Sequence, residues 1–198
     1  MIILEDMFLN PKKRKSKIIL LILCILVLSQ GCLFSKDKIV GVILREGSLI
    51  LPDKTQISIG DSFESLKSFS PRHLESHPGG DSYFLTSSSS INIDIDFDEK
   101  IRSFDIYLYS LDDAWTEIER VEVDGMIEVN RGMKREQLMN ILEDIGLHYE
   151  LDWRTSSTEI YFSLKNGYEV SFRFLAEIDG ELERVYYWKT APMSLLAE

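Results

Sequence analysis

The chain has 198 residues, with 22 basic and 33 acidic side chains, a formal net charge of −11 and only two cysteines. Five of the basic and two of the acidic side chains lie in the first 31 residues, which leaves 17 basic and 31 acidic ones after them, a net charge of −14. A field of this sign repels phosphate backbones and anionic lipid headgroups, which argues against a nucleic-acid partner and favours a basic protein.

The first recognisable segment is a basic cluster followed by a short apolar run and a cysteine. Lys12 to Lys17 carries five positive charges, Ile18 to Leu28 is apolar, and Ser29-Gln30-Gly31-Cys32 ends the run. This order is typical of an export signal, and the run is shorter than the roughly 20 residues of a membrane-spanning helix. The ending at Gly31 and Cys32 resembles the lipobox of bacterial lipoproteins. The alternatives are a signal anchor that stays in the membrane, or an ordinary signal peptide.

The lipoprotein resemblance implies cleavage before Cys32, whose sulfur then carries a diacylglycerol, and a place in the cell envelope. In a Gram-negative host, Leu33 after the cysteine implies the periplasmic face of the outer membrane. Because Cys24 lies in the signal, the mature domain has no disulfide and no thiolate nucleophile or metal ligand. We therefore expect a signal peptide at residues 1–31, a tether at 32–38, a first repeat at 39–116 and a second at 117–198.

The first half of the domain is predicted to consist of strands interrupted by one short helix. Phe63, Leu66 and Phe69 share a helix face, which predicts a helix over Asp61 to Phe69 that Pro71 stops. Apolar and polar residues alternate from Ile91 to Asp98, which predicts a half-buried strand. The other expected elements are strands at Ile39 to Leu44 and Ser48 to Leu51, turns at Arg45-Glu46-Gly47 and Pro78-Gly79-Gly80, a polar loop at Ser87 to Ser90, and a return strand through Phe104, Ile106 and Leu108.

The second half repeats this order of elements. Met133 to Ile145 is the best helix of the chain, with Leu138 and Leu142 on its apolar face and Gly146 after its end. The other expected elements are a hairpin of Arg120 to Val123 and Met126 to Val129 around Asp124-Gly125, then strands at Leu147 to Leu151, Thr158 to Leu164, Tyr168 to Leu175 and Leu182 to Trp188, with two-residue turns at Asn166-Gly167 and Asp179-Gly180.

The two halves can be aligned as a tandem repeat. Gly60 to Leu66 lies over Gly132 to Leu138, and Glu117 to Val121 lies over Glu181 to Val185. We therefore expect an α+β fold of two tandem helix-on-antiparallel-sheet units, because no crossover spacing for a parallel sheet is present. A unit in which Gly-x-x-x-x-x-Leu opens a helix resembles the small barrel-assembly lipoproteins of the outer membrane and the repeats of the beta-lactamase inhibitor protein. Both families imply exported binding proteins without catalytic activity.

No catalytic constellation is evident in the sequence. His73 and His77 are spaced to share a helix face and to bind a metal, but a third ligand is missing and the segment precedes a turn, so a surface loop is expected. The sequence has no Gly-x-Ser-x-Gly elbow, no phosphate-cradling glycine loop and no marked carboxylate pair. We therefore expect no enzyme activity, no metal site, no cofactor and no small-molecule substrate.

An acidic and aromatic strand face is the candidate binding surface. Asp94 and Asp96 alternate along one strand, and Asp105, Tyr107 and Tyr109 lie on one face of the next. Exposed tyrosines among charges are typical of binding surfaces. For the acids, a solvated strand face is the more common explanation, and for the tyrosines a second packed layer explains the pattern equally well. If the face lies elsewhere, the second repeat offers Tyr161, Lys165 and Trp188.

These observations favour a membrane-anchored, non-enzymatic binding lipoprotein of the bacterial envelope. Strong negative charge and the absence of catalytic motifs favour an inhibitor or immunity factor that neutralises a secreted toxin or enzyme. The alternative is an accessory lipoprotein of envelope or outer-membrane assembly, which the same repeat resemblance implies. In either case the expected partner is a protein, bound at the face that carries Asp94, Asp96, Asp105, Tyr107 and Tyr109.

Overall fold

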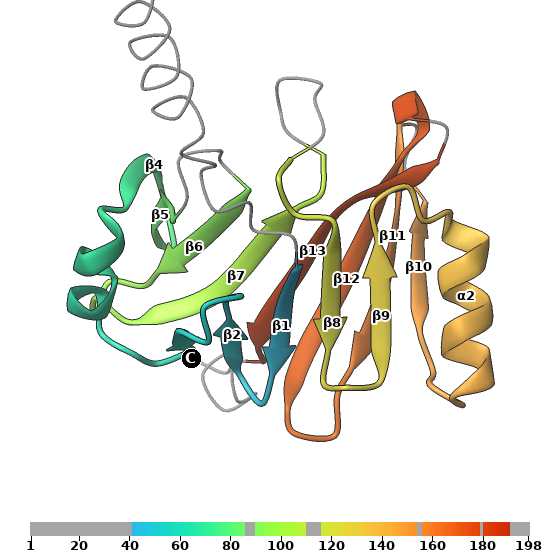
Figure 1. The fold of residues 1–198 in the computed structure, drawn as a ribbon, viewed down its shortest axis with the longest axis horizontal. Coiled ribbons are helices and arrows are strands. Elements are labelled where there is room, and N and C mark those ends of the chain that lie inside the picture. The colour runs from blue at the N-terminus through green and yellow to red at the C-terminus, as the bar shows by residue number, and fades with distance from the viewer. Residues whose placement is uncertain (1–40, 86–89, 110–115, 154–155, 179, 191–198) are drawn as a thin grey trace, which may run out of the picture. The chain divides into compact units, whose positions relative to one another are not determined.

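Strands dominate the computed structural model, which describes residues 41–85, 90–109, 116–153, 156–178 and 180–190. They account for 54% of the described structure and form two sheets (Figure 1). The five-stranded sheet has the order β3-β2-β1-β8-β9, and the eight-stranded sheet has the order β10-β11-β12-β13-β7-β6-β5-β4. The expected α+β fold of two helix-on-sheet units is therefore wrong.

The five-stranded sheet contains β1 (Gly41–Arg45), β2 (Ser48–Ile50), β3 (Gln56–Ser58), β8 (Arg120–Val123) and β9 (Ile127–Asn130). The eight-stranded sheet contains β4 (Arg72–His77), β5 (Gly80–Phe84), β6 (Ile91–Ile95), β7 (Ile101–Tyr107), β10 (Glu150–Trp153), β11 (Ser157–Ser163), β12 (Tyr168–Leu175) and β13 (Glu181–Lys189). The described helices are the 3-10 helices η2 (Phe63–Phe69) and η3 (Ala176–Ile178) and the α-helix α2 (Arg135–Asp144). Most strands that the sequence predicts are confirmed, with ends that differ by at most three residues.

The predicted helix of the first half is a 3-10 helix. Its apolar residues Phe63, Leu66 and Phe69 are spaced by three, which is the number of residues per turn of a 3-10 helix, and Leu66 is buried. The helix of the second half is confirmed as α2, where Leu138 and Leu142 share the buried face. Only the second half thus has an α-helix among its described residues, which removes the basis for two equivalent units.

The two halves of the chain contribute strands to both sheets. β1 from the first half pairs with β8 from the second in parallel, with Val42 opposite Val121, although the sequence indicated antiparallel sheets alone. β7 from the first half pairs with β13 from the second in antiparallel fashion. The order of elements recurs in the halves as expected, but the halves interleave, because their strands pair with each other.

One hydrophobic core lies between the sheets. The alternating apolar residues of β1, β8 and β9 belong to the same buried cluster as those of β6, β7, β12 and β13. In Figure 1, β1, β8 and β9 of the five-stranded sheet lie in front of β12 and β13. The apolar faces of both sheets are thereby removed from water, which supplies most of the stabilisation of the fold.

The turn between β1 and β2 connects the sheets directly. The backbone N–H of Gly47 donates a buried hydrogen bond of 3.0 Å to the hydroxyl of Tyr187, which stacks on Tyr168 with ring centroids 5.4 Å apart. Gly47 has φ +80°, and a Cβ there would lie 2.2 Å from the Tyr168 hydroxyl oxygen. Only glycine therefore fits at this contact.

Gly47→Ala is expected to lower the free energy of unfolding by about 2 kcal/mol or more, because it adds backbone strain and displaces Tyr168. Gly167→Ala is the matched control, since Gly167 has φ +82° and open space around a Cβ. Urea unfolding of both variants measures the difference. An equal loss in the two variants would contradict the role of the Gly47 contact.

Candidate functional site

Two residues of the face expected to bind a partner lie on β7, where this strand pairs with β13. Asp105 and Tyr107 are 5% and 8% exposed, which agrees with the packed layer that the sequence left open and not with an exposed face. Asp105 accepts a 2.9 Å hydrogen bond from Arg184, whose guanidinium also lies over the Tyr107 ring. Burial raises the pKa of Asp105 to about 6, although Arg184 lowers it, and burial also raises the pKa of Tyr107. These side chains belong to the packing of the sheet, on the face opposite the core.

Asp94 belongs to the same polar cluster. Its carboxylate accepts hydrogen bonds of 2.6 Å from the hydroxyls of Ser82 and Ser103 and one of 3.1 Å from Tyr186. Its side chain is 17% exposed. With three donors on one carboxylate, Asp94 connects β5, β6, β7 and β13 and presents little surface to a partner.

Asp96, the second acidic residue of the predicted face, lies beyond the end of β6, in the turn between β6 and β7. Its carboxylate accepts the backbone N–H groups of Asp98 and Lys100 at 3.0 and 2.8 Å. Phe97, expected on the buried face, is 77% exposed because the strand ends at Ile95. Tyr109 is partly exposed, and its backbone N–H donates to the carbonyl of Glu183 at 3.1 Å. The five predicted residues thus do not form one open face.

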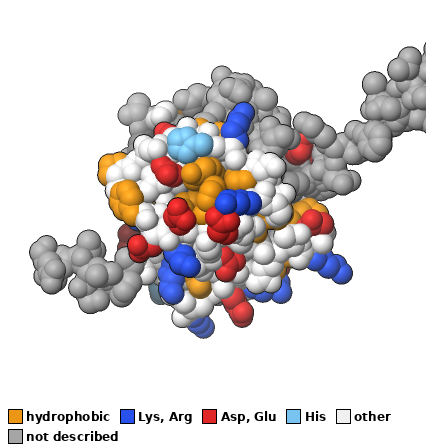
Figure 2. Space-filling model, turned by 90° about the vertical axis from the view of Figure 1, so that its left-hand side faces the viewer, with side chains coloured by type: hydrophobic (Ala, Val, Ile, Leu, Met, Phe, Trp, Pro, Cys, Tyr) orange, Lys and Arg blue, Asp and Glu red, His pale blue; other side chains and the backbone are white. Residues whose placement is uncertain are grey.

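The predicted loop around the two histidines is instead the edge strand β4. His73 packs edge-on against Tyr83, with ring centroids 5.3 Å apart, and a bulge between His73 and Glu75 interrupts its pairing with β5. Figure 2 shows hydrophobic side chains at this end of the molecule with a histidine and charges of both signs around them. Among the described residues, no group of three His, Cys, Asp or Glu side chains could hold a metal ion.

The expected lipidation site at Cys32, the expected signal peptide and the expected tether lie outside the described residues, as do Ser87 to Ser89 of the expected loop and Asp179. Within the part of the chain that the structure describes, none of the helices has the length and apolar character required to cross a membrane.

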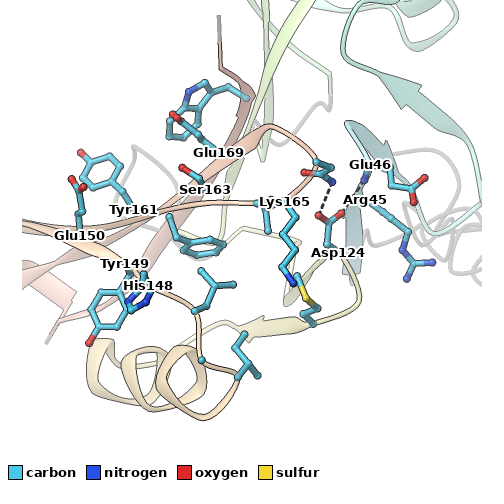
Figure 3. A pocket seen from close by; sticks show the side chains of 18 of the residues that line it. Arg45, Glu46, Asp124, His148, Tyr149, Glu150, Tyr161, Ser163, Lys165 and Glu169 are labelled. Carbon is cyan, nitrogen blue, oxygen red and sulfur yellow. Dashed lines mark hydrogen bonds between the residues drawn. The ribbon is translucent and has the colours of Figure 1, made fainter. Parts of the chain in front are cut away.

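An open cleft of about 1110 Å³ lies at the opposite end of the eight-stranded sheet from β4 (Figure 3). It is bordered by the segment after α2, by the start of β10, by the end of β11, and by the β1–β2, β8–β9 and β11–β12 turns. Tyr161, Lys165 and Trp188, the alternative surface indicated by the sequence, all line it. The structure therefore brings these three residues together at one site.

The apolar part of the cleft contains large side chains that are unusually exposed. Met126 in the β8–β9 turn is 51% exposed, and Ile145 just after α2 is 44% exposed. Phe162 of β11 and Leu164 directly after it also line the cleft and are buried, and Leu147 is half-buried. Sequence reasoning missed Met126 and Ile145, because each was assigned to the apolar pattern of its element.

Acidic side chains dominate the rest of the lining. They are Glu46, Asp124, Glu150, Asp152 and Glu169, against the basic Arg45 and Lys165. Asp124 also orders the border, because its carboxylate accepts the backbone N–H of Glu46 at 2.9 Å and the side-chain amide of Asn166 at 3.0 Å. Asp124 thereby holds three turns from distant parts of the sequence at the same border of the cleft. The excess of carboxylates over basic side chains in the lining attracts cations.

The cleft continues onto the outer face of the eight-stranded sheet, opposite the core. The registers place Trp188 of β13 beside Glu169 of β12, and Glu169 beside Ser163 of β11. In the adjacent row, Tyr161 lies beside Glu150 of β10. Figure 3 shows Tyr161, Ser163, Glu169 and Glu150 on this side. The cleft therefore has an apolar half toward the core and an acidic, aromatic half outside.

Comparisons with protein-family models, with curated proteins and with solved structures found no match to this chain.

The buried Asp105 is expected to make stability depend on pH. Its folded pKa of about 6 lies above the ordinary value of 3.8, so the folded state binds a proton more readily than the unfolded state between these values. The free energy of unfolding of the wild type, relative to Asp105→Asn, should therefore increase as pH falls from 7.5 to 5. Chemical unfolding at both pH values measures this difference. Asp98→Asn, which changes an exposed carboxylate in the β6–β7 turn, is the control. A pH-independent difference for Asp105→Asn would contradict the argument.

Proposed function

We propose that this protein is a non-enzymatic binding lipoprotein of the bacterial envelope, which captures a basic protein partner in the cleft. The observation that carries the proposal is the exposure of Met126 and Ile145 inside a cleft with an acidic border. Large apolar side chains gathered in an open cleft are costly in water and are typical of the centre of protein interfaces.

The charges of the cleft support a basic partner. Five carboxylates against two basic side chains line it, and the chain after residue 31 has a net charge of −14. Long-range attraction of this kind accelerates the encounter with a basic protein, and the apolar contacts then slow its dissociation. The expected salt dependence is a faster association at low ionic strength.

The proposed role is an inhibitor or immunity factor, lipid-anchored through Cys32, which neutralises a secreted toxin or enzyme. A cleft that recognises charge and apolar area requires no catalytic group, and a tether at 32–38 would keep the domain close to the membrane that it protects. The identity of the captured partner separates this role from an envelope-assembly accessory: a toxin or enzyme supports the first, and an assembly component supports the second.

Cys32→Ser is expected to abolish membrane association and to change the size of the mature protein, because the thiolate that would carry the lipid is absent. Cell fractionation and labelling with a radioactive fatty acid measure both effects. Unchanged membrane association and an unchanged precursor size would contradict the lipoprotein assignment. Cys24→Ser is the matched control, since it lies in the apolar run of the signal.

The double change Met126→Asp with Ile145→Asp is expected to lower partner capture from the envelope fraction at least about tenfold, because it places charges where apolar contacts form. Phe97→Asp is the control, since Phe97 is 77% exposed but does not line the cleft. Circular dichroism and thermal unfolding verify that all variants fold. Equal capture by the double variant and the wild type would contradict the cleft as the binding site.

A further inference from the structure

The cleft exists because β10 does not extend along the last residues of β11. Pairing between the two strands begins at Glu150 opposite Tyr161, whereas β11 continues to Ser163. The preceding residues Leu147 to Tyr149 line the cleft without belonging to a strand. The final residues of β11 therefore pair with β12 alone among the described strands.

The backbone of Ser163 faces this gap. The N–H of Leu164 donates to the carbonyl of Tyr168 at 2.7 Å, so the backbone groups of Leu164 point toward β12. Consecutive residues of an antiparallel strand direct their N–H and C=O groups to opposite sides. The N–H and C=O of Ser163 consequently point away from β12, toward the line along which β10 would continue. A strand end of this kind accepts another extended segment.

The two halves of the cleft match the alternation of a strand. Side chains of an added segment would point in turn to the core side and to the outer face. On the core side they meet Phe162, Leu147 and Ile145. On the outer face they meet Ser163, whose small side chain leaves a long side chain free to extend over it toward Glu169 and Trp188, which occupy the same row.

We propose that the partner docks through a short extended segment that adds to the free end of β11, with apolar and cationic side chains in alternation. This inference rests on the proposed function and specifies the kind of segment that the cleft recognises. The cationic side chain lies between the carboxylates of Glu150 and Glu169 and over the aromatic rings of Tyr161 and Trp188, where charge attraction and cation–π contact both favour it.

Two peptides of equal composition test the order of side chains. One is an acetylated, amidated hexapeptide in which lysine and valine alternate, and the other has three lysines followed by three valines. With the full chain in detergent, calorimetric titration is expected to show at least about tenfold tighter binding of the alternating peptide. Equal affinities of the two peptides would overturn the proposal, because charge and composition alone would then explain binding.

Methylation of individual backbone nitrogens of the alternating peptide tests strand addition while leaving the protein intact. At least one position should lose about tenfold in affinity, because the methyl group removes a donor and blocks approach to Ser163. Ser163→Pro should lower the affinity for the unmethylated peptide to a similar extent, because proline lacks the backbone N–H that Ser163 directs away from β12 and toward the added segment. A full methyl scan without effect would overturn strand addition, whether or not Ser163→Pro folds.

Glu169→Lys tests the outer half of the cleft. This variant should bind the alternating peptide about tenfold more weakly. Glu75→Lys, on the opposite edge strand β4, makes the same change of charge and should leave the affinity unchanged. Equal effects of the two variants would overturn the assigned position of the cation.

The inference and the proposed function fail separately. If neither peptide binds while Met126→Asp with Ile145→Asp still abolishes partner capture, the extended segment is wrong and the cleft remains the binding site. If the alternating peptide binds and the double variant still captures the partner, the segment preference holds and the proposed function is wrong.

Discussion

The pairing of β7 with β13 is the interaction on which the rest of the structure depends. It joins four strands from each half of the chain into one sheet, with Phe104 opposite Tyr187 and Tyr107 opposite Arg184. On the outer face, Arg184 offsets the buried charge of Asp105. Removal of Arg184 would leave the buried carboxylate of Asp105 without its cation, which costs more than the ion pair contributes.

The same strand also builds the cleft. Successive residues of β13 point to opposite faces, so Tyr187 points to the core and Trp188 to the outer face. Tyr187 accepts the N–H of Gly47 and so fixes the β1–β2 turn, which supplies Arg45 and Glu46 to the cleft. Trp188 lies on the outer half beside Glu169. One strand therefore positions both sides of the site on rigid elements.

Alternation and turn residues predicted the strands well, because both depend on local sequence. Asn166-Gly167 placed the β11–β12 hairpin, and Tyr168 to Leu175 was predicted with the correct bounds. What a strand pairs with depends on distant residues, so the parallel pairing of β1 with β8 was not foreseen. Alternation also cannot tell whether a second face is covered. For that reason the sequence left open whether Tyr107 is exposed or packed, and in the structure Arg184, 77 residues away in sequence, packs against it.

The two edges of the eight-stranded sheet differ in how they are protected against association, and this difference supports the cleft as the binding site. Unpaired edges invite association, and proteins blunt them with bulges and charges. β4 follows this rule, with a bulge after His73 and charged side chains along an exposed strand. The end of β11 does not follow it, because exposed Met126 and Ile145 lie in the same cleft as its open edge. An edge that combines backbone groups unpaired among the described strands with exposed apolar area is a liability unless a partner covers it, and the acidic border favours the basic partner that we propose.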